Sequence, residues 1–208
     1  HHYLAIADPE GSWKYADVDP TAFPRALLLQ LKNSIKASKK AINLGDIITE
    51  AYNEVFLQQE KGLGIYFGGC SLIVMEVELK TGAMHYVNWG STGFIVNAGN
   101  VRNEFVTEKM DKIGIEFKNV KVFQAMNAQK VEKVQDKWIL MASNGFSKQV
   151  TSEAAREALS SSKEDMNEAC FELWQRAMKG CHRPDDITII LFEWNKCETE
   201  NKDNLLIR

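Results

Sequence analysis

The spacing of apolar and polar positions predicts a strand and two helices at the start of the chain. Residues 2–8 form a short apolar run that ends on an aspartate, which is typical of a strand, and the turn-rich residues 9–20 predict a surface loop. Helical spacing follows over residues 20–41 and again over residues 43–62, where Gly62 is a candidate stop. The apolar face of the first helix consists of Leu27, Leu28, Leu31 and Ile35.

In the middle of the chain the period changes from helical to strand-like. Residues 70–90 predict two strands around a Thr-Gly turn, and residues 94–106 predict another pair around Gly-Asn. Residues 120–134 predict a further strand or hairpin. The run over residues 137–143 is apolar on both faces, which favours a central strand.

Two helices and one strand are predicted to complete the fold. The helices cover residues 152–160 and 163–180, and the strand covers residues 185–194. Long runs of hairpins between helix pairs favour the α+β class, with a central antiparallel β-sandwich flanked by pairs of α-helices, over a doubly wound parallel sheet. We expect one domain over residues 1–195 and a charged C-terminal tail over residues 196–208.

Composition narrows the classes of function. The 208 residues are 45% hydrophobic and 25% charged, which is typical of a globular domain. The net charge of −3 lacks the basic excess of nucleic-acid-binding proteins. No apolar run approaches the ~20 residues that span a bilayer. Four scattered cysteines do not form a disulfide framework, so we expect an intracellular, reducing location.

Four short segments carry the candidate chemistry. In chain order they read IADPEGSW, NWGSTGF, ILMASNGF and RPDDITIIL, and each joins a predicted strand to a polar turn. Their order and context resemble the metal-dependent protein phosphatases of type 2C. They are most similar to the small organellar branch of that family, whose ADG, GDSGF, TDG and PDDIT motifs occupy these places. The stretch WKYADVDPTAFPRAL also resembles the region that follows the first motif in that branch.

The resemblance implies an αββα fold and two Mn²⁺ or Mg²⁺ ions that activate a water against a phosphoserine or phosphothreonine. Carried over by position, Asp8 matches the bridging aspartate of the first motif and Asp185 the aspartate that opens the last strand. Three matched positions differ. Pro9 replaces a glycine, and Ser91 and Asn144 each replace an aspartate.

The missing carboxylates weaken the predicted metal site. Two divalent ions ~4 Å apart repel each other by about 16 kcal/mol at an effective dielectric of ~20, and nearby anions must offset that repulsion. Asn144 offers only a neutral oxygen and Ser91 only a hydroxyl. Pro9 also favours an extended backbone at Asp8. One cation held by Asp8 and Asp185 is compatible with these residues, but a tight pair is not expected.

Plain structural interpretations of these residues stay open. Asp8 at a strand end is compatible with a turn former, and the pair Asp185 and Asp186 with a solvated turn. Asn144 followed by Gly145 is a common turn dipeptide, and this interpretation is favoured once the carboxylate is absent.

The sequence therefore predicts a pseudophosphatase that binds a phosphoprotein or serves as a structural subunit of a larger assembly. No cofactor is expected, and Mn²⁺ or Mg²⁺ only if activity remains. The alternative is an active phosphatase with an atypical site, completed by an upstream segment or by Asp17, Asp19 or Asp186. A purely architectural protein is a third possibility. The organellar branch also predicts a mitochondrial location.

Overall fold

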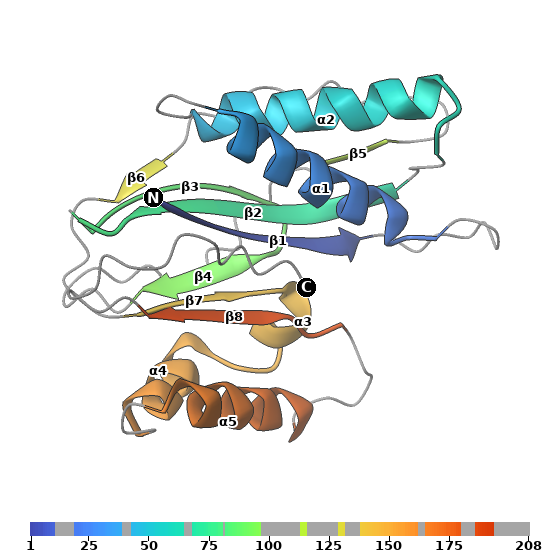
Figure 1. Cartoon of the computed structure of the whole chain (residues 1–208). Coiled ribbons are helices and arrows are strands. Elements are labelled where there is room, and N and C mark those ends of the chain that lie inside the picture. The colour runs from blue at the N-terminus through green and yellow to red at the C-terminus, as the bar shows by residue number, and fades with distance from the viewer. Residues whose placement is uncertain are drawn as a thin grey trace.

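The structure is a sandwich of two antiparallel sheets with a pair of helices on each outer face (Figure 1). The computed structural model describes residues 1–10, 19–38, 43–64, 68–80, 82–96, 113–115, 129–131, 138–161, 165–179 and 186–193. Its element order agrees with the predicted α+β class. None of the helices in these ranges combines the length and apolar character that crossing a bilayer requires.

Within the described ranges, eight strands form the two sheets. The first sheet has the order β1-β2-β3-β6, with β5 also paired to β2; its strands are β1 (His2–Glu10), β2 (Gly68–Glu78), β3 (Ala83–Trp89), β5 (Ile113–Ile115) and β6 (Gln129–Val131). The second has the order β4-β7-β8, with strands β4 (Gly93–Val96), β7 (Trp138–Ala142) and β8 (Ile189–Glu193). Strand β7 is the central strand of the second sheet, as predicted from a run that is apolar on both faces.

The helices cover the sheets in pairs (Figure 1). On the first sheet lie α1 (Ala22–Ala37) and α2 (Leu44–Glu60), and on the second lie α4 (Ser152–Ser161) and α5 (Met166–Lys179). The Asn43 side chain caps α2 by accepting a hydrogen bond from the Gly45 N–H at 2.9 Å. Gly62, with a φ of 68°, follows α2 in the left-handed conformation that ends many helices.

Three apolar layers hold the sandwich together, and the alternation of β2 separates two of them. Leu72 and Val74 point toward α1 and α2, whereas Ile73 and Met75 point toward the second sheet. The third layer packs α4 and α5 against β4 and β7. Residues i and i+2 on one strand share a face, so the unbroken apolar run of β2 supplies both layers.

The structure departs from the sequence predictions in three places. The first strand continues through Pro9 and Glu10, which were predicted as the start of a loop. Strand β5 was not predicted. Asn144 and Gly145 begin the short helix α3 (Asn144–Ser147) instead of forming the predicted turn. Residues 97–106, most of residues 120–134 and the tail over residues 196–208 lie outside the described residues.

Candidate functional site

The predicted site residues gather at one end of the sandwich, which we call the mouth. Asp8 lies near the end of β1 and is paired across the ladder with Ser71 of β2. The Ser71 Oγ accepts a hydrogen bond from the Ser91 N–H at 2.7 Å, and the two hydroxyl oxygens lie 3.0 Å apart. On the other side of Asp8, its Oδ2 accepts a hydrogen bond from the Asn144 N–H at 3.3 Å. The structure thus brings together three positions that are far apart in the sequence.

Pro9 lies in β1 opposite Cys70, beyond Asp8. A proline has no N–H to donate to a ladder and is tolerated on an outer strand, which β1 is among the described strands of its sheet. Asp8 is extended, as the residue before a proline should be. The extended backbone predicted for Asp8 is thus observed, within a strand that continues past the proline.

A tight turn after β3 places Ser91 against Ser71. Gly90 has a φ of 85°, a conformation that side chains with a Cβ rarely adopt. A Cβ at this position would overlap the Ser71 side chain and lie 2.9 Å from the Ser71 Cα. The turn is closed by Asn88, whose Nδ2 donates to the Thr92 carbonyl at 2.8 Å and whose Oδ1 accepts from the Thr92 hydroxyl at 2.9 Å.

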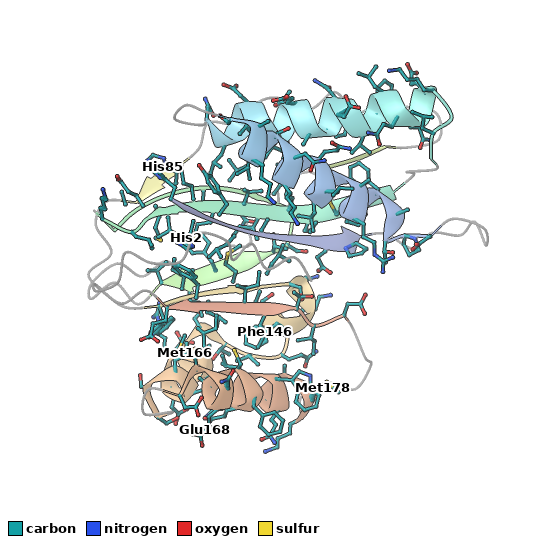
Figure 2. The ribbon with its side chains drawn as sticks, in the orientation of Figure 1. His2, His85, Phe146, Met166, Glu168 and Met178 are labelled. Atoms are coloured by element: carbon teal, nitrogen blue, oxygen red, sulfur yellow. The ribbon has the colours of Figure 1, made fainter. Side chains whose placement is uncertain are left out.

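A second junction, between β7 and α3, places Asn144. The buried Ser143 hydroxyl accepts the Thr188 N–H at 3.0 Å and donates to the Asp186 carbonyl at 3.1 Å. Phe146 anchors α3 by packing into the apolar layer under α4 and α5 (Figure 2). The segment before β8 is thus fixed to the end of β7 at the mouth.

Asp185, the second predicted ligand, lies outside the described residues. Its neighbour Asp186 is described, and the hydrogen bond from Ser143 ties the backbone of that neighbour to the mouth.

Ser71 is a site residue that the sequence analysis missed. It belongs to an apolar run without a motif, and its role arises from the pairing of β2 with β1 and from the approach of the turn at Gly90. In the sequence, Ser71 could be noticed only as a single hydroxyl next to the apolar residues that follow it in β2.

Among the described residues, the donors at the mouth carry little negative charge for a pair of divalent cations. Asp8 is the one carboxylate among the contacts described above, and Ser71, Ser91 and Asn144 are neutral. Within the described ranges, no three histidine, cysteine, aspartate or glutamate side chains are grouped so that they could hold a metal ion. Divalent Mn²⁺ and Mg²⁺ favour several charged oxygens, so the described donors by themselves offer too little charge for two such ions.

Comparison with known proteins identifies the fold. No family model and no curated protein matches the chain. Among solved structures, it superposes on serine/threonine phosphatase Stp1 from Staphylococcus aureus with a TM-score of 0.69 at 14% identity, over 93% of this chain and 84% of that one. The fold is that of type 2C serine/threonine phosphatases.

Two more of these phosphatases show the same likeness. The Mycobacterium tuberculosis serine/threonine phosphatase PstP/Ppp gives a TM-score of 0.59 at 13% identity, over 92% of this chain and 97% of that one. The photosystem II phosphatase PBCP gives 0.63 at 19% identity, over 84% and 67%. At this level of identity the likeness establishes the architecture alone.

Proposed function

We propose that the chain is a catalytically degenerate member of the type 2C phosphatase fold, a pseudophosphatase that acts as a binding or structural subunit. The observation that carries the proposal is the donor set at the mouth. Asp8, Ser91 and Asn144 come together at the mouth, and at these three positions one carboxylate remains where the resemblance implies three. Asp185, the fourth matched position, keeps its carboxylate in the sequence and lies outside the described residues. The shape of the site is kept while its charge is reduced.

Charge is the decisive quantity because the ions of a two-metal site repel each other strongly. Replacing two aspartates by a serine and an asparagine removes two negative charges from the mouth. The Ser91 hydroxyl is also held 3.0 Å from the Ser71 hydroxyl, so these neutral groups bond to each other. A site of this kind stabilises at most one cation, and two-metal activation of water needs both.

Hydrolysis of p-nitrophenyl phosphate with and without Mn²⁺ tests this proposal. We expect no Mn²⁺-dependent turnover in the wild-type chain and the same background rate in Asp8→Ala. Mn²⁺-dependent turnover that Asp8→Ala abolishes would overturn the proposal and establish an atypical active phosphatase.

Restoring the two carboxylates provides a second test. The double variant Ser91→Asp/Asn144→Asp should bind Mn²⁺ at least about tenfold more tightly than the wild type, because each new charge attracts the ion in a partly buried site. The variant Asn53→Asp/Gln175→Asp is a matched control, since it adds the same charge at exposed helical positions away from the mouth. Equal affinity in both double variants would contradict the charge argument.

The alternative, an active phosphatase with substitute ligands, draws on Asp8 and on three further aspartates. Asp19 already has a structural role, since its Oδ1 accepts both the Thr21 N–H at 2.8 Å and the Thr21 hydroxyl at 2.7 Å before α1. The Thr21 hydroxyl and N–H hold the pKa of the Asp19 carboxyl below its usual value. Asp186 holds Ser143 through its carbonyl, and Asp17 lies outside the described residues.

For the binding role, we propose a phosphoserine- or phosphothreonine-containing protein as the partner. Titration of a phosphopeptide against its unphosphorylated form measures this directly. Phosphate-dependent binding supports the docking role. Equal, weak binding of both peptides, together with purification at fixed stoichiometry in a complex, would favour a purely structural subunit.

The proposed location is mitochondrial, on the resemblance to the organellar branch. Fractionation of cells that express the natural full-length protein tests it. Recovery outside mitochondria would overturn the location without affecting the proposed loss of activity.

A further inference from the structure

One side of the sandwich ends in two outer strands that lie over each other. Among the described strands, β1 pairs only with β2 and β8 pairs only with β7, so each ends its sheet. The His2 and Phe192 rings lie 5.6 Å apart and connect the two strands across the sandwich. Figure 1 shows both strands on the same side of the molecule. We call this side, formed by β1 and β8, the open side.

The side chains at the open side are apolar and only partly covered. Residues 139–142 of the central strand β7 are buried, whereas every residue of β8 is partly exposed. Leu4, Ile190 and Phe192 belong to the layer between the sheets but are not fully buried. Outer strands are usually protected from pairing by charges, prolines or bulges. In β1 such residues stand only at the end of the strand, at Asp8, Pro9 and Glu10, and residues 2–7 contain no lysine, arginine, acidic residue or proline. Strand β8 likewise carries a single charge at its end.

An exposed apolar stripe on α5 borders this side. Phe171, Trp174 and Met178 are 57%, 44% and 45% exposed and follow the i, i+3, i+7 spacing of a helix-pairing surface. The Phe171 and Trp174 rings are stacked against each other with their centroids 5.9 Å apart.

The stripe faces away from the neighbouring helix. Arg176 of α5 reaches α4, where it donates to the Ala154 carbonyl and to Glu157 at 3.2 Å each. Trp174 lies about 200° around the helix from Arg176, at 100° per residue. The stripe therefore lies on the flank of α5 that is turned away from α4, on the helix that packs against β8.

We propose that the open side and the α5 stripe form the contact between two copies of this chain. Antiparallel neighbours in a sheet are related by a twofold axis perpendicular to that sheet. One such axis, normal to both sheets, pairs β1 with β1, β8 with β8 and α5 with α5 of the second copy. An extended peptide from another protein would complete only one of the two strands, so a second copy is the occupant that matches all three elements.

The charges on α5 are complementary in this arrangement. Glu168 and Lys179 are exposed, and eleven residues bring them to nearly the same line along the helix. Figure 2 shows Glu168 and Met178 toward opposite ends of α5. An antiparallel second copy places each Glu168 near the opposite Lys179, whereas a parallel one would place like charges together.

Sedimentation of the full chain over a range of concentrations tests the contact. We expect a reversible dimer, and we expect Trp174→Glu to weaken it at least about tenfold, because a charge would be buried among aromatic rings. Leu57→Glu is the matched control, since Leu57 on α2 is also 44% exposed and lies outside the contact. A wild-type monomer at every soluble concentration, or an equal effect of both variants, would overturn the proposal.

Charge exchange tests the antiparallel orientation even if the tryptophan variant fails to fold. Glu168→Lys and Lys179→Glu should each weaken the dimer, and the double variant should restore it toward the wild-type affinity. A double variant that is weaker than either single variant would exclude this pairing.

Hydrogen exchange tests the pairing of the strands. On dimerisation, alternate amides of β1 and β8 should become protected as the outer edges form ladders. Unchanged exchange in both strands in a confirmed dimer would overturn the proposed pairing.

Discussion

At the scale of single residues, the mouth depends on one close approach. The N–H of Ser91 reaches the Ser71 hydroxyl only because Gly90 adopts a positive φ and has no Cβ to separate the two segments. The same glycine thus places Ser91 against Ser71, which is the ladder partner of Asp8. The backbone conformation of Gly90 therefore sets the geometry at Ser91, a position where the motif resemblance implies an acidic ligand.

Gly90→Ala should destabilise the fold by about 2–4 kcal/mol, from backbone strain and from overlap with Ser71. Gly62→Ala is the control: its φ is also positive, at 68°, but no atom lies within 4 Å of an added Cβ. That variant should lose only the backbone part, about 1–2 kcal/mol. Urea unfolding of both variants gives the comparison. Equal losses would show that the approach to Ser71 is not tight.

Tyr3 makes the stability of the fold depend on pH in the alkaline range. Its hydroxyl donates to the buried Glu76 carboxylate at 2.7 Å. Burial raises the pKa of Tyr3 well above its usual value of 10.0, and the Glu76 hydrogen bond and charge raise it further. The folded chain thus keeps this proton at a pH where the unfolded chain has lost it. Stability from this group is complete below pH 10 and declines as the pH rises above 10.

Tyr3→Phe should therefore cost about 1–3 kcal/mol at neutral pH, because Glu76 loses a buried donor. The variant should also lose less stability than the wild type between pH 8 and pH 11. Denaturant unfolding at the two pH values measures both effects. The difference between the wild type and Tyr3→Phe in this loss of stability is due to Tyr3, because Tyr52, whose pKa is also raised by burial, is present in both proteins. Parallel losses in the two proteins would contradict the assignment.

At the scale of elements, the junction of β7, α3 and β8 depends on Ser143. This side chain is the N-cap residue of α3, yet its hydroxyl serves Thr188 and Asp186 of the segment leading into β8. The strand β7 and the start of β8 are therefore joined by side-chain as well as ladder hydrogen bonds.

Ser143→Ala should destabilise the chain by about 1–3 kcal/mol, because the Thr188 N–H and the Asp186 carbonyl lose a partner inside the protein. Ser160→Ala is a suitable control, since the Ser160 hydroxyl bonds the Arg156 carbonyl on an exposed part of α4. Its effect should stay within about 0.5 kcal/mol. Thermal unfolding followed by circular dichroism gives both values. Similar effects of the two changes would count against this role of Ser143.

The elements themselves could be predicted where apolar spacing was long and regular. Both helices before β2, the hairpin of β2 and β3, and the central place of β7 follow from period and turn chemistry. The three-residue strand β5 could not be found this way, because it is too short to show a period. The dipeptide of Asn144 and Gly145 is common in turns and predicts one here. In the structure these two residues begin α3, whose next residue, Phe146, is buried.

At the scale of the whole molecule, the sandwich brings Asp8, Ser91 and Asn144 to one end although they come from three distant segments. The motif resemblance predicted which positions would meet. It could not predict Ser71, whose part depends on strand register, nor the contact of Asp8 with the Asn144 backbone. Asp185 stays a prediction. The open side likewise follows from sheet order, which apolar spacing alone does not provide.

Calorimetric titration of the full chain with Mn²⁺ tests the central claim, that the mouth holds too little negative charge for two divalent ions. We predict binding of at most one Mn²⁺ per chain, weakened by Asp8→Ala, with a second ion appearing only in Ser91→Asp/Asn144→Asp. Tight binding of two Mn²⁺ per wild-type chain, both lost in Asp8→Ala, would contradict the account.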